Sequence, residues 1–144
     1  MSDIIYFDTS ALAKWYLNET RSDDVEEYLQ QHGPIAISEL TIVEMRCLLA
    51  RRRREKNLTT NLEEEIFTTF QEDIRRRFLI CHSFPANLAA GAVNLMVFLG
   101  DLPVRTLDAM HLVIAKEIGA DILVTADHVM ADAAEALSLI VVRF

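Results

Sequence analysis

Short, almost wholly apolar segments alternate with longer stretches of helical periodicity along this chain, and this alternation constrains the fold more than any other feature. Five segments have the length and character of buried strands, at residues 4–7, 35–37, 78–81, 122–124 and 139–142. Helical patterns fill the intervals, at residues 9–16, 22–31, 38–54, 60–77, 85–99 and 106–119, with a short helix after Asp127. Apolar strands separated by helices predict an α/β fold, in which helices cover both faces of a parallel sheet.

The length of 144 residues suits a single domain spanning residues 1–144. The hydrophobic fraction of 51% and the charged fraction of 25% exclude a disordered chain, and four Gly and three Pro are too few for a many-stranded β barrel. Cys47 and Cys81 stand in apolar surroundings and are predicted to be reduced core residues. Neither a signal peptide nor an apolar run of membrane-spanning length is seen, so we expect a cytoplasmic protein.

The net charge of −8 conceals an uneven distribution. Residues 46–77 contain nine basic and six acidic side chains, whereas the rest of the chain contains five basic and sixteen acidic ones. A basic segment attached to an acidic body leaves a nucleic-acid partner open. The arginine runs at 51–54 and 75–77 are either solvated helix ends or phosphate contacts, and both interpretations stay open.

Four carboxylates are expected along one edge of the sheet. Asp8 ends the first strand and Asp127 closely follows the fourth. Asp108 lies in the first turn of its helix, and Glu44 lies about 9 Å along the helix that Ser38 caps. The carboxyl ends of parallel strands share the edge at which such folds bind ligands, so these side chains are candidates for one site.

Each carboxylate, taken singly, also has a structural interpretation. Asp8 and Asp127 could be helix N-caps, and Asp108 could complement a helix dipole. Glu44 could form a capping box with Thr41. Taken together, converging carboxylates with few basic residues nearby repel one another unless a divalent cation intervenes. Oxygen ligands without a His or Cys cluster favour Mg²⁺ or Mn²⁺.

Four motifs, in order along nearly the whole chain, carry a resemblance to a known family. They are Phe7-Asp8-Thr9-Ser10, Leu40-Thr41-Ile42-Val43-Glu44, Leu107-Asp108-Ala109-Met110-His111-Leu112 and Thr125-Ala126-Asp127. The chain resembles the PIN-domain nucleases, and within them the VapC toxins of bacterial and archaeal toxin–antitoxin systems. The resemblance implies a five-stranded parallel sheet of order 3-2-1-4-5 and Mg²⁺-dependent hydrolysis of RNA phosphodiester bonds.

The resemblance also implies a site and partners. The implied catalytic and metal-binding set is Asp8, Glu44, Asp108 and, often through water, Asp127. The hydroxyl groups implied to orient these carboxylates belong to Thr9, Ser10 and Thr125. A VapB-type antitoxin and a homodimer are the implied protein partners. The apolar helix at 85–99 is a candidate dimer surface, although burial in the monomer explains its composition equally well.

Rival functions remain open at this stage. A non-toxin PIN-domain nuclease would carry the same acids, and a non-enzymatic acidic interaction module would use them only as helix caps. An aspartate-based phosphotransfer site needs a lysine late in the chain, and none follows Lys116.

Some side chains near the predicted edge are interpreted as structural. His111, three residues after Asp108, is interpreted as a satisfied, half-buried histidine, with a carboxylate or phosphate contact as the alternative. His82 and His128 also lie near strand ends, and contact with RNA is the weaker interpretation of His128. Trp15 is assigned to the core.

Overall fold

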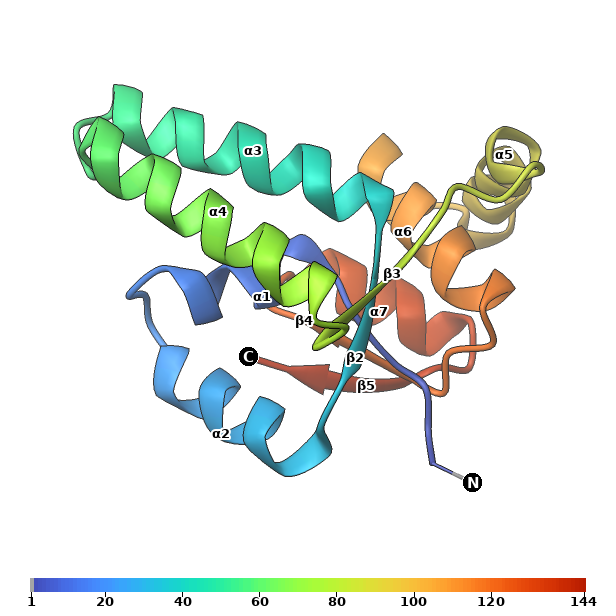
Figure 1. Ribbon diagram of the computed structural model, residues 1–144. Helices are drawn as coiled ribbons and strands as arrows, with labels where there is room; N and C mark the ends of the chain where they lie inside the picture. Colours follow the sequence, from blue (N-terminus) through green and yellow to red (C-terminus); the bar gives the residue numbers. More distant parts are fainter. Residues whose placement is uncertain (1) are drawn as a thin grey trace.

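Five parallel strands form one sheet in the computed structural model, which describes residues 2–144 (Figure 1). The strands are β1 (Ile5–Phe7), β2 (Ile35–Ser38), β3 (Leu79–His82), β4 (Ile122–Thr125) and β5 (Ile140–Arg143). Their order across the sheet is β3-β2-β1-β4-β5, which confirms the predicted fold class and strand order. The strand that ends at Asp8 is therefore central, and its carboxyl end lies at the middle of one sheet edge.

Seven helices in the described residues cover the two faces of this sheet. They are α1 (Thr9–Tyr16), α2 (Ser22–His32), α3 (Glu39–Arg54), α4 (Thr60–Arg75), α5 (Leu88–Leu99), α6 (Thr106–Glu117) and α7 (His128–Ala136). Side chains alternate along β1, so that Ile5 and Phe7 pack with residues of α1 to α4, whereas Tyr6 packs with residues of α5 to α7. The core is thus divided by the sheet into two layers.

Helices α3 and α4 form an antiparallel pair that extends beyond the sheet (Figure 1). Ser38 caps α3 in a capping box with Thr41, so Glu44 is not needed for that box. The sequence Thr60-x-x-Glu63 predicts a capping box at the start of this helix, but that prediction is wrong, because Thr59 is the N-cap of α4 and accepts the Leu62 N–H at 3.1 Å.

Glu63 is instead buried between α3 and α4. It accepts hydrogen bonds from Arg46 at 2.5 Å and from Arg53 at 2.7 Å, both donated by guanidinium groups of α3. These two ion pairs join α3 and α4.

The prediction of two core cysteines is wrong for Cys47, which is exposed on α3, whereas Cys81 is half-buried in β3; both are free thiols. The sequence placed Cys47 among apolar neighbours, but the helical twist turns it to the outer face, away from Met45 and Leu49.

Helix α5 buries one face and exposes another. Ala92, Leu95 and Leu99 are buried, and Gly91 allows a close approach to α6, because a Cβ added there would lie 3.0 Å from Cγ1 of Val113. The opposite face is apolar as well and faces solvent. Within the described chain, each helix is too short or too polar to span a bilayer.

Candidate active site

The four predicted acids come from different elements and converge at the carboxyl end of the central strands. Asp8 follows β1, Glu44 lies on α3, Asp108 on α6, and Asp127 follows β4. The charges of Asp127 and Glu44 both act on Asp108, and the charge of His111 acts on Asp8, Glu44 and Asp108, which makes the four acids neighbours. The structure therefore brings the predicted set together.

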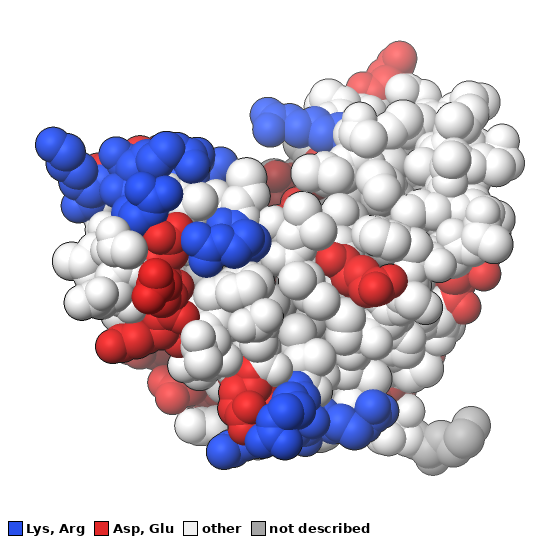
Figure 2. Space-filling view, turned by 45° about the horizontal axis from the view of Figure 1, so that its top comes forward, with Lys and Arg blue, Asp and Glu red and all other residues white. Residues whose placement is uncertain are grey.

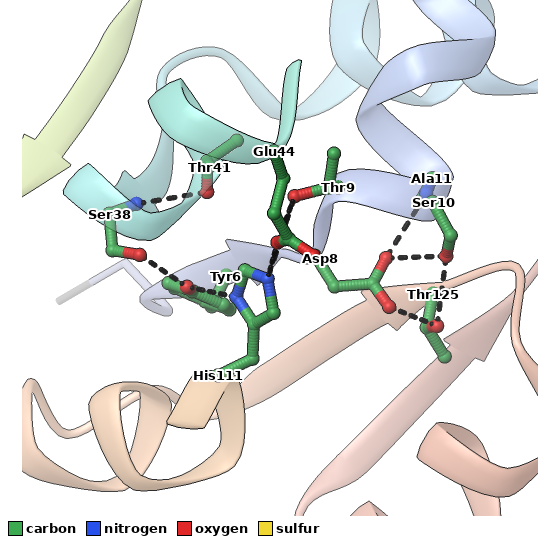
Figure 3. Close-up of polar contacts among 10 residues, drawn as sticks. All are labelled: Tyr6, Asp8, Thr9, Ser10, Ala11, Ser38, Thr41, Glu44, His111 and Thr125. Atoms are coloured by element: carbon green, nitrogen blue, oxygen red, sulfur yellow. Dashed lines mark hydrogen bonds and ion pairs between the residues drawn. The ribbon is translucent and has the colours of Figure 1, made fainter. Parts of the chain in front are cut away.

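Asp8 is buried and held by three donors. Its Oδ1 accepts the Ala11 N–H at 3.1 Å and the Ser10 hydroxyl at 2.7 Å, and its Oδ2 accepts the Thr125 hydroxyl at 2.5 Å (Figure 3). Burial raises the pKa of Asp8 above its ordinary value, although His111 and the hydroxyl donors act in the opposite direction. Asp8 is the N-cap of α1, as its structural interpretation anticipated.

Ser10 and Thr125 connect this carboxylate to the next strand. The Ala126 N–H donates to Oγ of Ser10 at 2.9 Å, and the Asp127 N–H donates to Oγ1 of Thr125 at 3.0 Å. The two hydroxyls lie 3.3 Å apart. Each hydroxyl accepts a backbone proton while it donates to Asp8, which fixes both the rotamer of Asp8 and the start of the segment that carries Asp127.

Glu44 is held by a different pair of donors. Its Oε1 accepts the Thr9 hydroxyl at 2.7 Å and a hydrogen bond from Nε2 of His111. Burial alone raises the pKa of Glu44, but the hydrogen bond and charge of His111, with Thr9, lower it below the ordinary value. Because a carboxylate only accepts, Nε2 of His111 carries a proton.

His111 belongs to a buried chain of polar side chains that the sequence did not predict in this form. Nδ1 of its ring lies 2.6 Å from the Tyr6 hydroxyl, and that hydroxyl lies 3.0 Å from Oγ of Ser38 (Figure 3). His111 is 2% exposed, so it is more deeply buried than the predicted half-buried histidine. Its spacing from Asp108 was the only sequence signal, and its actual carboxylate partner, Glu44, lies on another helix.

Asp108 and Asp127 have looser surroundings. Asp108 is half-buried, and its Oδ2 accepts the Arg105 N–H at 3.4 Å. Burial, followed by the charge of Asp127, raises the pKa of Asp108. Asp127 is exposed and caps α7, with Oδ1 accepting the Met130 N–H at 2.9 Å. No hydrogen bond among the described residues occupies its second oxygen.

Comparison with known proteins places this geometry in a family. The PIN domain family matches residues 5–136. The chain belongs to the PIN-domain family. It is 30% identical over 141 residues to Ribonuclease VapC46 of Mycobacterium tuberculosis, a match that covers 96% of this chain and 95% of that protein. The resemblance drawn from the four motifs is therefore confirmed.

Solved structures of low sequence identity share the PIN fold. VapC20 of M. tuberculosis, described as a sarcin-ricin loop cleaving toxin, has a TM-score of 0.70 at 17% identity, over 90% of this chain and 94% of that one. VapBC2 of Rickettsia felis, bound to a DNA fragment from its promoter, has a TM-score of 0.69 at 17% identity, over 98% of both chains.

The donor set of this PIN domain suits a hard divalent cation. Within residues 2–144, Asp8, Asp108 and Asp127 make no ion pair, and the one ion-pair partner of Glu44 is His111. Several carboxylate oxygens without a cationic side chain match the preference of Mg²⁺ and Mn²⁺. No three Asp, Glu, His or Cys side chains of residues 2–144 are already arranged around one point as metal ligands. Metal binding therefore requires side-chain rotation, for which the loosely held Asp108 and Asp127 are free.

Proposed function

We propose that this protein is a divalent-metal-dependent endoribonuclease and the toxin of a VapBC-type toxin–antitoxin pair. The observation that carries the proposal is the convergence of Asp8, Glu44, Asp108 and Asp127 without a basic side chain to neutralise three of them. Membership of the PIN family and the similarity to Ribonuclease VapC46 support hydrolysis of RNA.

Asp8, Glu44 and Asp108 would hold Mg²⁺ or Mn²⁺, and Asp127 would complete the set through water. A cation bound there would polarise the phosphate, activate a water molecule and stabilise the leaving oxygen. Asp127 lies at the open side of the set, since it is the most exposed of the four.

The surrounding side chains would keep the carboxylates ionised and oriented. Thr9 and His111 donate to Glu44 and hold its pKa low, so Glu44 is available as an anion at neutral pH. Ser10 and Thr125 hold both oxygens of Asp8. Asp108 lacks comparable support, and burial, followed by the charge of Asp127, raises its pKa; a bound cation would favour the ionised form against both effects.

The observed helix caps do not favour the interaction-module alternative. Asp8 and Asp127 both cap helices, as that alternative requires, but capping leaves Oδ2 of Asp127 available and does not explain why Glu44 and Asp108 converge on the same edge. The phosphotransfer alternative lacks its late lysine, because none follows Lys116 in the sequence and Lys116 itself donates to the Leu137 carbonyl.

Two protein partners form part of the proposal. Structural neighbours include toxin–antitoxin complexes such as VapBC from Salmonella typhimurium bound to DNA, which supports a cognate antitoxin. A homodimer is supported by the exposed apolar face of α5. The alternative is a PIN-domain nuclease without an antitoxin. Purification of the protein from its native cells distinguishes the two, because the alternative predicts that no antitoxin copurifies.

The test combines cleavage with metal binding. The purified protein is expected to cleave RNA with Mg²⁺ or Mn²⁺ and to stop in excess EDTA. Millimolar Mn²⁺ should also raise the melting temperature of the wild type, but not of Asp108→Asn. The exposed Asp101, which has no hydrogen-bond partner in the described chain, supplies the matched control Asp101→Asn, which should respond as the wild type does. Cleavage that persists in EDTA would exclude the metal mechanism.

A further inference from the structure

Three buried polar side chains form a row that ends at Glu44. They are Ser38 in β2, Tyr6 in β1 and His111 on α6, which are 0%, 0% and 2% exposed. The Tyr6 hydroxyl lies 3.0 Å from Oγ of Ser38 and 2.6 Å from Nδ1 of His111 (Figure 3). Nε2 of His111 then donates to Glu44. Hydrogen bonds therefore connect the middle of the sheet to one of the four acids.

The row begins and ends on the same helix. Ser38 caps α3 in the capping box with Thr41, and Glu44 lies six residues after Ser38, about 9 Å along the axis. Between these two points the row passes through β1 at Tyr6 and through α6 at His111. The position of Glu44 relative to the start of its own helix is thus tied to two other elements.

The same elements carry two more of the acids. His111 follows Asp108 by about one turn on α6, and Asp8 follows Tyr6 by two residues at the end of β1. Tyr6 itself contacts no acid, because its hydrogen-bond partners within residues 2–144 are Ser38 and His111. Any effect of its hydroxyl on the acids passes through the row.

Tyr6 holds the ring of His111 on the side opposite Glu44. A half-turn of the ring about its Cβ–Cγ bond would replace both nitrogen contacts with C–H groups, so the two contacts together fix its orientation. The partner of one ring nitrogen also influences whether the other carries a proton. Burial raises the pKa of Tyr6 well above its ordinary value, so the hydroxyl stays protonated. Without this hydroxyl, only the contact with Glu44 would orient the ring.

Glu44 turns one oxygen to these supports and leaves the other free. The Thr9 hydroxyl and Nε2 of His111 both donate to Oε1. No hydrogen bond among residues 2–144 involves Oε2, which makes it the oxygen available to a cation. The two donors on Oε1 set the direction of Oε2, and a rotated His111 ring would change that direction.

We propose that Tyr6 is a positioning residue of the metal site, which acts through His111 to fix the orientation of Glu44 and thereby favours small cations. The proposal rests on the proposed function, in which Glu44 is a metal ligand. Mg²⁺ requires near-ideal octahedral geometry, whereas Ca²⁺ accepts irregular sets of oxygen ligands. A loosely held Glu44 therefore costs more affinity for Mg²⁺ than for Ca²⁺.

The first experiment removes the hydroxyl and keeps the aromatic ring. Tyr6→Phe is compared with the matched control Tyr16→Phe, because the Tyr16 hydroxyl donates to Asp73 at 2.5 Å and joins α1 to α4. Affinities for Mg²⁺ and Ca²⁺ are measured by isothermal titration. Tyr6→Phe should bind Mg²⁺ about tenfold more weakly, as for a lost group that supports a metal ligand, and Ca²⁺ less than about threefold more weakly. Tyr16→Phe should bind both cations as the wild type does.

The second experiment tests whether Tyr6 acts through His111. His111→Phe fills the site with a ring that has no nitrogen, so Glu44 loses this donor whether or not the Tyr6 hydroxyl is present. Adding Tyr6→Phe to His111→Phe should change the Mg²⁺ affinity by less than about twofold, although each single variant weakens it. Circular dichroism establishes that the variants are folded, and His111→Leu, which also lacks a nitrogen, replaces His111→Phe if that variant is not.

The outcomes separate this inference from the proposed function. If the wild type binds Mg²⁺ and cleaves RNA but Tyr6→Phe binds Mg²⁺ equally tightly, Tyr6 has no positioning role and the nuclease proposal stands. Equal losses in Tyr6→Phe and Tyr16→Phe would show a general loss of stability instead, and equal losses for Mg²⁺ and Ca²⁺ would contradict selection by size. A further loss in the double variant would contradict action through His111. A wild type that binds no divalent cation would contradict the proposed function itself.

Discussion

The buried carboxylate of Asp8 opposes folding when it is ionised, because burial raises its pKa. Asp8→Asn keeps the shape, remains a good N-cap and lets the Thr125 hydroxyl accept instead of donate. We expect the variant to lose RNA cleavage by at least a hundredfold and, in EDTA at pH 7, to melt at a higher temperature than the wild type. Thermal unfolding and single-turnover cleavage test the two parts, and a wild-type cleavage rate would remove Asp8 from the site.

His111 is expected to position Glu44 through Nε2 specifically. His111→Gln places an amide donor near the Nε2 position, whereas His111→Asn places its amide near Nδ1, toward Tyr6. His111→Gln should therefore retain Mn²⁺ affinity, and His111→Asn should weaken it about tenfold or more, as is usual when a group that supports a metal ligand is lost.

Isothermal titration of both variants with Mn²⁺ distinguishes a role of His111 in positioning Glu44 from a role in core packing alone. Both substitutions remove the same ring from a buried site, so both should lower the melting temperature by similar amounts. A purely structural role for His111 would lower the Mn²⁺ affinity of both variants equally.

The sequence, through the family resemblance, predicted the acids and the hydroxyls of Thr9, Ser10 and Thr125 that donate to them, but it did not predict the support from His111. Asp8 directly follows β1, and Asp127 follows β4 after Ala126, so their position at the sheet edge can be predicted from the local sequence. The partners of His111 are 105 residues away at Tyr6 and 67 residues away at Glu44, and contacts of that range depend on how α3 and α6 pack. Periodicity predicts which residues share a helix face and says nothing of which faces meet.

At the scale of elements, the α3–α4 pair depends on the buried Glu63. Removing its charge by Glu63→Gln leaves Arg46 and Arg53 without their anion, although both guanidinium groups are about two-fifths exposed and can be hydrated. We expect a loss of about 1–3 kcal/mol in the free energy of unfolding, measured by urea denaturation. The neighbouring Glu64→Gln, at an exposed position, should change it by less than about 0.5 kcal/mol. Equal effects would show that the ion pairs contribute nothing.

Strand order and helix identity were predictable at this scale, and the two errors share one cause. Thr59 and Thr60 are both good N-cap residues. Thr59 is the one that caps α4, and Glu63 lies on the buried face of the helix instead of forming a capping box. Cys47 was assigned to the core because its neighbours are apolar, but it lies in a groove beside Glu44. Both errors concern the rotation of a helix about its axis relative to its tertiary partners.

At the scale of the molecule, the charge asymmetry of the sequence becomes a spatial one. Residues 46–77, which carry the excess of basic side chains, correspond to most of α3 and all of α4. Figure 2 shows a group of Lys and Arg side chains at the upper left of the molecule and further groups at the top centre and the lower edge. Several of them are neutralised within the pair, for example Arg75 and Arg76 by Glu72. The basic surface that is free to contact phosphate is therefore smaller than the sequence count suggests. Any phosphate contact is expected at the arginines that make no ion pair.

The exposed face of α5 is the best support for association of two copies. Val93, Val97 and Phe98 are 61%, 77% and 69% exposed. Val93 and Val97 lie about one turn apart, and Phe98 follows Val97, on a helix whose other face is already packed on α6. Burying apolar side chains on this scale is favourable by about 25 cal/mol per Å², so a second copy meeting the same face would gain from both sides of the contact.

Val97→Lys should therefore shift the protein from dimer to monomer. In light scattering at micromolar concentration, the wild type should have twice the mass of the chain, and Val97→Lys should have the mass of one chain, because two lysines would face each other across the symmetric contact. Ile140→Lys is the matched control, since Ile140 is a comparably exposed aliphatic residue on β5, with 63% of its surface accessible, and should leave the dimer intact. A wild type that is monomeric under these conditions would contradict the dimer, and a control that dissociates as Val97→Lys does would move the contact from α5 to another surface.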